Sequence, residues 1–301
     1  MKTRRTFIKQ IGLGTALISL SPLQAFSNVA KKPIKLTILH TNDMHSHIEA
    51  LSSGSNKGLG GMFQLSSLVK KIRQEEENIL LLDAGDIFQG TPYFNLFGGE
   101  LEFRLMSDIG YDAVTIGNHD FDNGIDGLNS QLLKASFDII SSNYDFSNTI
   151  LENKIKRTKT YVLDEVKIGV FGLGIELKGL VSDELFKETK YLDPVEISND
   201  ITDYLKNEEN CDLIICLSHL GFKYRKNKIS DFILAQKTKD IDLIIGGHTH
   251  TFMDKPTITK NKIGNDVIIN QVGCFGIYLG KIDFYLDTDK IKIAKSKLLT
   301  I

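Results

Sequence analysis

One stretch decides the fold of this chain: Ala113-Val114-Thr115-Ile116-Gly117-Asn118-His119-Asp120-Phe121-Asp122. Its first four residues are apolar or β-branched and predict a strand. The glycine that follows lets the backbone turn tightly where the strand ends. The next five residues bring an amide, an imidazole and two carboxylates into one loop. A single Asn or Asp here would indicate only a turn, but four such side chains together indicate a functional site.

The same residue types recur in four other loops, each of which follows an apolar run typical of a strand. These loops are Asp43-Met44-His45, Gly85-Asp86, Ser218-His219 and Gly247-His248-Thr249-His250. Strand patterns that alternate with helical ones predict an α/β fold, and open α/β sheets place their sites at strand ends. We therefore expect the five loops to meet at one site.

The hydrophobic pattern predicts where these elements lie along the chain. Strands are expected at 34–39, 79–82, 113–116, 137–141, 167–172, 213–217, 243–245, 266–270, 280–286 and 290–294. Helices are expected at 62–72, where apolar residues recur every three or four positions, and at about 101–106. No internal repeat or linker divides the sequence, so one large domain is expected.

The loops together offer seven potential metal ligands. They are Asp43, His45, Asp86, Asn118, His219, His248 and His250. If the backbone stays extended, the side chains of Asp43 and His45 point to the same side of it and can converge on one ion. Seven ligands are too many for one tetrahedral ion but suit two divalent ions about 3.5 to 4 Å apart that share a carboxylate. The absence of thiolate favours Zn, Mn or Fe, with Zn or Mn preferred.

The charge of such a site suggests its substrate. Two divalent cations, two carboxylates and a bridging hydroxide leave a net charge of about +1, which attracts a phosphate ester without holding its product irreversibly. Attack of the metal-bound hydroxide on phosphorus is then the expected reaction. His119 lies three residues before Asp122, so this carboxylate could hold the imidazole cationic and aimed at the reacting phosphoryl group.

These loops resemble the motifs of the calcineurin-like metallophosphoesterases, in particular the branch of 5′-nucleotidases and UDP-sugar hydrolases. The resemblance covers about residues 34–286. It implies a four-layer fold in which two packed mixed β-sheets are flanked by helices, within a metallophosphoesterase domain at 31–301. It also implies one metal held by Asp43, His45, Asp86 and His250, and a second held by Asp86, Asn118, His219 and His248. His119 and Asp122 would be catalytic, with Asn118 and His119 contacting substrate.

The resemblance implies hydrolysis of nucleoside 5′-monophosphates. The alternatives are a 2′,3′-cyclic-nucleotide phosphodiesterase, a nucleotide-sugar hydrolase, or a metal-bearing subunit that needs a partner. Two departures from the family pattern stand out. Asp120 occupies a position where the family usually has Glu, and we expect the protein to lack the nucleoside-binding C-terminal domain of the branch. We therefore expect a separate C-terminal-domain protein to supply base recognition, and a slow, broad activity from the chain alone.

Composition argues against nucleic acid and membrane surfaces as partners. The 301 residues are 42% apolar and 25% charged, with a formal net charge of −2. Residues 1–30 contain four basic and no acidic residues, so their removal leaves 32 basic against 38 acidic residues, a net charge of −6. An acidic protein without a long basic run is a poor polyanion binder.

The N-terminus is typical of an export signal. Arg4 and Arg5 precede a modest apolar segment from Ile11 to Leu20, which resembles a twin-arginine signal peptide cleaved between about Ala25 and Ala30. An uncleaved membrane anchor is the alternative, although the segment is short for a bilayer span. We expect a periplasmic protein without a stable anchor. The three cysteines fit no disulfide framework or zinc motif and are expected to be buried apolar fillers.

Overall fold

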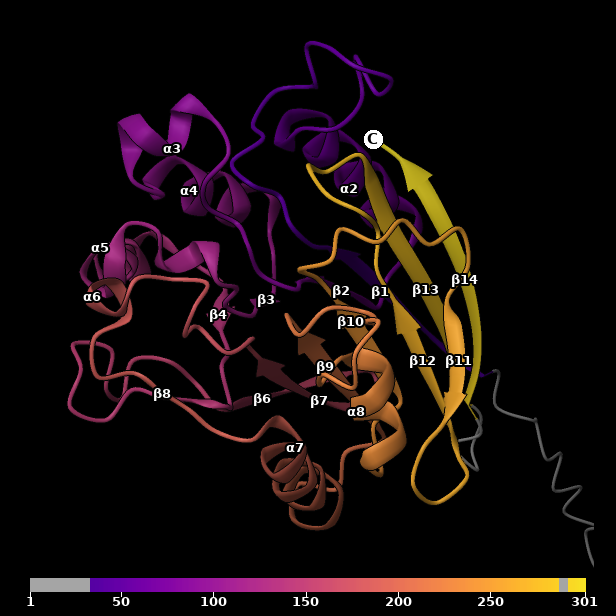
Figure 1. Cartoon of the computed structure of the whole chain (residues 1–301). Coiled ribbons are helices and arrows are strands. Elements are labelled where there is room, and N and C mark those ends of the chain that lie inside the picture. Colours follow the sequence, from indigo (N-terminus) through magenta and orange to yellow (C-terminus); the bar gives the residue numbers. More distant parts are fainter. Residues whose placement is uncertain (1–32, 287–291) are drawn as a thin grey trace, which may run out of the picture. The chain divides into compact units, whose positions relative to one another are not determined.

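Two six-stranded sheets pack against each other in the computed structural model, which describes residues 33–286 and 292–301 (Figure 1). The first sheet has the order β14-β13-β1-β2-β3-β4. Its strands are β1 (Ile34–Thr41), β2 (Ile79–Asp83), β3 (Ala113–Val114), β4 (Asp138–Ile139), β13 (Tyr278–Leu286) and β14 (Lys292–Thr300). The expected signal peptide at 1–30 lies outside the described residues.

The second sheet has the order β11-β12-β10-β9-β7-β6. Its strands are β6 (Thr158–Leu163), β7 (Val166–Leu173), β9 (Leu213–Ser218), β10 (Leu243–Gly246), β11 (Thr257–Lys260) and β12 (Asp266–Asn270). A separate two-stranded ribbon joins β5 (Tyr144–Asp145) to β8 (Lys190–Tyr191).

Both sheets are mixed, with a parallel centre. In the first, β1 to β4 pair in parallel while β13 pairs antiparallel with β1 and with β14. In the second, β7, β9, β10 and β12 are parallel, and β6 and β11 are antiparallel edge strands. The carboxyl ends of parallel strands meet at one edge of a sheet, so the loops that follow them are brought together.

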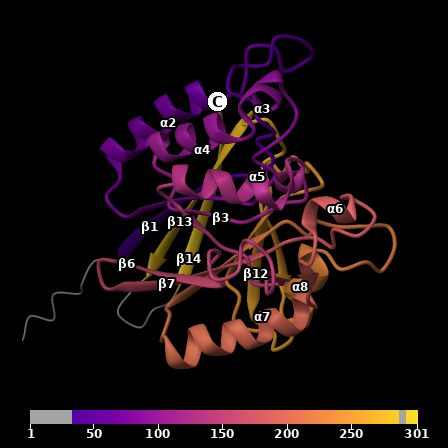
Figure 2. The same cartoon turned by 90° about the vertical axis from the view of Figure 1, so that its left-hand side faces the viewer.

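Helices cover the outer faces of the sheets (Figure 2). The α-helices are α2 (Met62–Glu75), α3 (Pro92–Phe97), α4 (Glu100–Ile109), α5 (Gly124–Gln131), α6 (Asp183–Phe186), α7 (Pro194–Asp203) and α8 (Asp231–Lys237). Short irregular helical turns are η1 (His119–Phe121), η2 (Leu132–Lys134) and η3 (Tyr204–Glu208). The buried side chains of α2, α4 and α5 share a core with the outer face of the first sheet, and α8 packs on the second.

The residues of β9 show why this arrangement forms. Leu213, Ile215 and Leu217 belong to the core between the two sheets, whereas Ile214 and Cys216 belong to the core under the helices. A strand buried on both faces reads as a continuous apolar run because successive side chains point to opposite sides. The expected four-layer fold, two mixed sheets flanked by helices, is confirmed.

Most predicted elements are present, with different lengths. The strand expected at 113–116 ends at Val114, and the one expected at 137–141 covers only Asp138–Ile139. The last strand runs over Lys292–Thr300, where 290–294 was expected. The three cysteines are free and buried, as expected.

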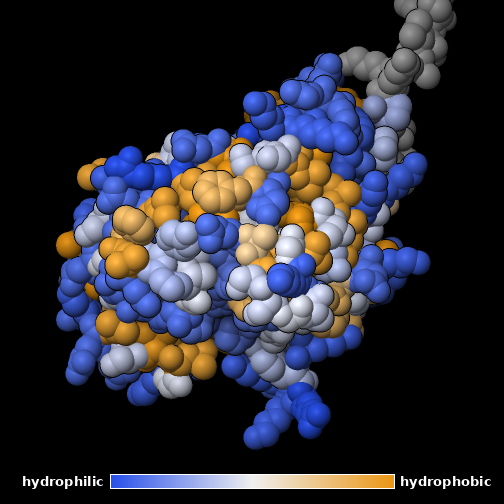
Figure 3. Space-filling model, turned by 90° about the horizontal axis from the view of Figure 1, so that it is seen from above, coloured by the Kyte–Doolittle hydropathy of each residue, from blue (hydrophilic) through white to orange (hydrophobic). Residues whose placement is uncertain are grey.

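Large apolar side chains remain exposed on α2 and α3. Phe63, Leu96 and Phe97 are each more than half exposed. Seen from above, the surface carries apolar patches interrupted by polar side chains (Figure 3). No helix within residues 33–286 and 292–301 is long and apolar enough to cross a bilayer.

An ion cluster away from the strand-end loops joins the end of α2 to the first sheet. Glu76 accepts hydrogen bonds from Lys35 at 2.6 Å and from Lys281 at 2.7 Å. Burial alone would raise the pKa of Glu76, but the two lysines outweigh it and hold the pKa below its ordinary value of 4.5. A carboxylate with a lowered pKa contributes stability above its unfolded pKa and loses it as pH falls through the folded one.

We therefore expect Glu76→Gln to lower the free energy of unfolding by about 1 kcal/mol at neutral pH. The deficit should shrink as the pH falls below 4.5 and through the lowered pKa of the folded wild-type protein. Urea unfolding of both proteins at neutral pH and at the lowest pH at which both stay folded measures this. Glu77→Gln changes the neighbouring exposed carboxylate and is the matched control. An equal deficit at both pH values would contradict the ion-cluster explanation.

Candidate metal centre

The seven predicted ligands meet where the two sheets present their strand ends. Asp43 follows β1, Asp86 follows β2 and Asn118 follows β3, all in the first sheet. His219 directly follows β9, and His248 and His250 follow β10, in the second sheet. The cluster therefore depends on the packing of one sheet against the other.

The ligand atoms form two groups. Asp43, His45 and His250 make the first group, and Asp86, His219 and His248 make the second; within each group the atoms lie within 4.8 Å of one another. In the first group Nε2 of His250 lies 3.0 Å from Nε2 of His45 and 3.4 Å from Oδ1 of Asp43. Two ring nitrogens and a carboxylate that converge in this way are suitable ligands for a divalent cation.

Asp86 lies between the two groups. Its Oδ2 atom is 3.0 Å from Nε2 of His219 and 3.8 Å from Nε2 of His45. Asn118 extends the second group, because its Oδ1 atom lies 2.9 Å from Nδ1 of His248. The geometry thus suits two neighbouring ions that share the Asp86 carboxylate.

The environment of His219 tests whether these residues fit a metal. Its Nδ1 atom lies 2.6 Å from the carbonyl oxygen of Ala84, which accepts a hydrogen bond and fixes the ring orientation. Its Nε2 atom is buried and faces Oδ2 of Asp86 at 3.0 Å, without a hydrogen bond of suitable geometry to any described residue. An imidazole that is oriented by a carbonyl and turns its other, buried nitrogen toward a further potential ligand is the usual environment of a metal-binding histidine. The residues therefore fit a divalent metal.

The electrostatics of the second group favour positive charge between its members. Burial lowers the pKa of His219, but the Asp86 carboxylate outweighs this effect and raises it to about 10. Burial opposes ionisation of Asp86, yet His219 outweighs it and lowers the pKa of Asp86. Burial also lowers the pKa of His248, to about 4, so this ring is a neutral ligand at physiological pH. The attraction that favours a proton here also favours a divalent cation.

The first group also favours positive charge at one of its members, His250. Hydrogen bonds with Asp43 and Cys274 raise the pKa of His250 to about 10. Cys274 is therefore more than an apolar filler, because its thiol contacts a predicted ligand. Burial lowers the pKa of His45, against the attraction of Asp86 and Asp43.

His119 and Asp122 form a pair beside the two groups. Nδ1 of His119 lies 2.8 Å from Oδ2 of Asp122, and the side chains are 38% and 27% exposed. This hydrogen bond raises the pKa of His119. The backbone N–H of His119 donates to Oδ1 of Asp86, which fixes the loop against the shared carboxylate. His119 thus reaches the cleft as an oriented, accessible imidazole whose protonated form is favoured by Asp122.

The cleft itself has a volume of about 500 Å³ and includes residues that the sequence did not single out as site residues. These are His47, Gln89, Gly90 and Phe275. The rings of His47 and Phe275 stack with their centroids 4.2 Å apart. Phe275 belongs to none of the five strand-end loops that the sequence singled out. It reaches the cleft only because the fold places it there.

The backbone of the ligands differs from expectation. Asp43 and His45 are not extended; both have a left-handed backbone, with φ of 51° and 46°. Asp86, His248 and His250 also have positive φ, between 48° and 70°. Left-handed non-glycine residues carry strain and concentrate at functional sites. Asp43 and His45 converge because two left-handed residues turn the loop inward.

Asp120 holds two of the loops together. Its carboxylate accepts backbone N–H bonds from Asp86, Ile87, Phe88 and Gly117. These four donors belong to the loop after β2 and the loop after β3, so one side chain fixes the position of Asp86 relative to His119. The shorter acid, where the family pattern has Glu, still reaches both loops.

Gly117 packs directly against Asp86. A Cβ atom at this position would lie 2.2 Å from Oδ1 and 2.6 Å from the backbone nitrogen of Asp86. We expect Gly117→Ala to displace the shared carboxylate and weaken metal binding by about tenfold to a hundredfold, the usual range for residues that support ligands. Gly264→Ala is the control for backbone strain without a clash. Its φ of 88° strains any side chain, but the added Cβ atom would meet open space. Metal titration measures both, and unchanged affinity in Gly117→Ala would contradict this packing argument.

The two packed mixed sheets and the ligand groups at their common edge define the class of protein: an α/β protein with two adjacent candidate sites for divalent metals. The family model described as calcineurin-like phosphoesterase matches residues 36–252. The chain therefore belongs to the calcineurin-like phosphoesterases, a family of metal-dependent phosphoester hydrolases with a dinuclear divalent metal centre.

Known proteins are similar over most of this chain. Bovine (Bos taurus) 5′-nucleotidase is 34% identical over 302 residues, which cover 90% of this chain and 50% of the relative. A 5′-nucleotidase precursor from Thermus thermophilus superimposes with a TM-score of 0.81 at 30% identity, covering 89% of this chain and 55% of that structure. The calcineurin-like phosphoesterase YfkN from Bacillus subtilis gives a TM-score of 0.73 at 26% identity, with coverage of 89% and 91%. The chain spans about half the length of the curated relatives it matches first.

Proposed function

We propose that this chain is a two-metal hydrolase of phosphate monoesters that acts on nucleoside 5′-monophosphates. The observation that carries the proposal is the position of Asp86, whose Oδ2 atom lies 3.0 Å from a ring nitrogen of one ligand group and 3.8 Å from a ring nitrogen of the other. The similarity to 5′-nucleotidases supports the choice of substrate.

In this proposal each side chain has a defined task. Asp43, His45, Asp86 and His250 hold one ion, and Asp86, Asn118, His219 and His248 hold the other. Bound divalent metals, with Zn or Mn proposed, supply Lewis-acid activation of water and of the phosphoryl group. Asn118 and His119 contact the phosphoryl oxygens from the loop after β3. His119, held by Asp122, presents its second ring nitrogen to the leaving oxygen and donates a proton or stabilises its charge.

The test is hydrolysis by the purified chain loaded with Zn or Mn, followed as inorganic phosphate for the two monoesters and by chromatography of the nucleotide products for the cyclic nucleotide and the nucleotide sugar. AMP, a simple aryl phosphate, 2′,3′-cyclic AMP and UDP-glucose form the panel, because the last two represent the alternative activities. Hydrolysis of AMP that a chelator abolishes and added metal restores is the expected result. Hydrolysis of only the cyclic nucleotide or the nucleotide sugar would overturn the choice of substrate, and no metal-dependent hydrolysis would overturn the proposal.

Base selectivity belongs to the same proposal. Metals and phosphate contacts discriminate little between leaving groups, since selectivity needs stacking and hydrogen bonds to the base. Phe275 borders the cleft, but its ring already stacks on His47. We propose that a separate nucleoside-binding protein improves kcat/KM for AMP over the aryl phosphate. A strong preference for AMP by the chain alone would contradict this part.

Export through the twin-arginine route is a further part of the proposal. The adjacent Arg4 and Arg5 support this part. Paired arginines of this kind are typical of signal peptides that are recognised by an export pathway for folded proteins. The ligands come from five loops and assemble only in the fold, so the metals would be acquired before transport.

Replacing both Arg4 and Arg5 with lysine is expected to leave unprocessed protein in the cytoplasm. Cell fractionation and the mass of the N-terminal peptide measure this. Lys9→Arg, which leaves the pair intact, is the control and should be processed normally. Normal export of the double variant would indicate the general secretory route.

A further inference from the structure

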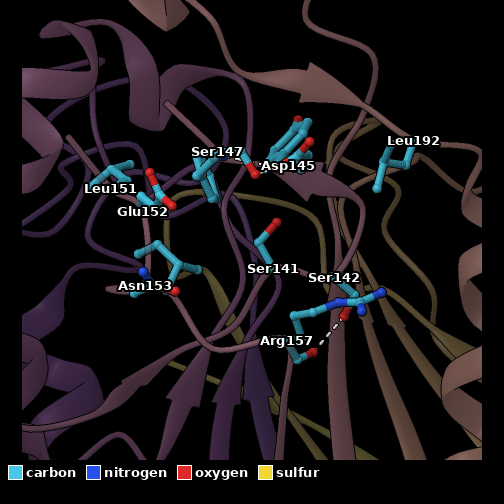
Figure 4. A pocket seen from close by; sticks show the side chains of 12 residues that line it. Ser141, Ser142, Asp145, Ser147, Leu151, Glu152, Asn153, Arg157 and Leu192 are labelled. Carbon is cyan, nitrogen blue, oxygen red and sulfur yellow. Dashed lines mark hydrogen bonds between the residues drawn. The ribbon is translucent and has the colours of Figure 1, made fainter. Parts of the chain in front are cut away.

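A second cavity lies apart from the metal cleft and shares no lining residue with it. Its volume is about 320 Å³. Its lining comes from three places in the chain: the segment from Ser141 to Ser147, the segment from Leu151 to Arg157, and Leu192 (Figure 4). A volume of this size is at the lower end of the range for small-molecule sites.

The cavity offers one positive charge and one unused hydroxyl group. Arg157 is the only cation among its described lining residues; it is exposed, and its guanidinium has no ion-pair partner within the described part of the chain. Ser141 is 2% exposed, and its hydroxyl has no hydrogen-bond partner among the described residues. Figure 4 shows this hydroxyl directed toward the middle of the cavity. A buried hydroxyl without a partner favours a ligand that accepts a hydrogen bond.

The two acidic lining residues are already engaged. Asp145 accepts hydrogen bonds from the backbone N–H and hydroxyl of Ser147, and Lys190 lies 3.6 Å away. Glu152 accepts the backbone N–H of Asn148 at 3.1 Å. With Asp145 paired to Lys190, the charges of Arg157 and Glu152 leave the lining without excess positive charge, so it does not suit a phosphate dianion. A single carboxylate can still pair locally with the Arg157 guanidinium.

Apolar and aromatic side chains form part of the wall, beside the polar Ser142, Ser147 and Asn153. This part consists of Tyr144, Phe146, Leu151, Ile155 and Leu192. The first three are at most 7% exposed. We propose that this cavity binds a small carboxylate with an apolar body, its carboxylate paired with Arg157 and hydrogen-bonded by Ser141. A planar guanidinium matches the two oxygens of a carboxylate.

The position of the cavity connects it to the metal centre. Tyr144 lines the cavity, and its ring meets that of Phe121 edge to face with centroids 5.7 Å apart. Phe121 lies between His119 and Asp122 in the chain. An occupant would therefore touch the ring that packs against the loop of the proposed catalytic pair.

The proposal is tested by fluorine NMR titration of the metal-loaded chain with 4-fluorophenylacetate. Saturating inorganic phosphate is present, so that the carboxylate cannot bind at the metals. The expected result is saturable binding that Arg157→Gln weakens by about tenfold or more, the loss of one charge-assisted pair. Ser141→Ala is expected to weaken binding by about fivefold, the loss of one hydrogen bond.

The controls separate specific recognition from loose association. Lys154→Gln changes a nearby exposed cation outside the lining and should leave the affinity unchanged. The neutral amide 4-fluorophenylacetamide should bind at least tenfold more weakly than the acid. Equal binding of acid and amide, no saturable binding, or an affinity indifferent to Arg157→Gln would each overturn the proposal. Phosphate hydrolysis is measured separately, so failure here leaves the proposed function intact.

Discussion

Asp86→Ala is expected to abolish both metal occupancy and turnover. The Asp86 carboxylate lies near ring nitrogens of both ligand groups, with contacts of 3.0 and 3.8 Å, and it approaches the second group more closely than Asp43 does, whose Oδ1 atom is 3.9 Å from Nε2 of His219. A shared carboxylate screens two cations from each other, and without it they repel at short distance. Elemental analysis of the purified variant should find less than one equivalent of metal, and phosphate release should fall to background.

Two further variants make the test of Asp86 specific. Asp86→Asn keeps the shape and one oxygen ligand, so it should retain more metal than Asp86→Ala. Asp126→Ala removes an exposed carboxylate paired with Lys187 and should keep both metals. Circular dichroism confirms that the variants are folded. Two equivalents of metal and near wild-type turnover in Asp86→Ala would show that Asp86 is not shared.

His119→Ala is expected to keep both metals but to lose about two to four orders of magnitude in kcat, the usual scale for a general acid or an electrostatic stabiliser. His119 belongs to neither ligand group, and its Nδ1 atom is engaged with Asp122 at 2.8 Å. Asp122→Asn should lose less, because it weakens the orientation of the imidazole and leaves the ring in place.

The double variant tests whether the two residues act as a unit. If Asp122 acts through His119, removing both should cost little more than His119→Ala alone. Elemental analysis accompanies the kinetics. Loss of one metal from His119→Ala would make this residue a ligand and contradict its catalytic role.

The sequence indicated that the reactive side chains would lie together, because each of them lies a few residues after a strand; their roles in metal binding and catalysis stay predictions. A continuous apolar run such as Ile79–Leu82 is a strong local signal, and the topology of parallel sheets then brings the strand ends together. His219 and His248 lie in the second sheet, and periodicity alone does not show how ten strands divide between two sheets. That division followed from the family resemblance.

Other parts of the structure have no local signal in the sequence. The edge strands β6 and β11 were missed because half-exposed strands carry a weak hydrophobic pattern, and tertiary pairing decides them. The left-handed backbone of Asp43 and His45 was also missed, since φ depends on the loop hydrogen bonds that the fold imposes. The place of Phe275 in the cleft depends on the packing of β1 and its neighbours, as its N–H bond to the Asp43 carbonyl shows.

Five ligands have positive φ values, so metal binding and backbone stability favour different residues at these positions. Glycine would adopt the φ of 70° at His248 without strain, so selection for thermal stability alone would favour loss of the ligand. A β-branched replacement would carry more strain than the native histidine. Thermostable versions that stay active therefore have to gain their stability elsewhere, in the core between the sheets or on the exposed helices, and keep the strained loops as they are.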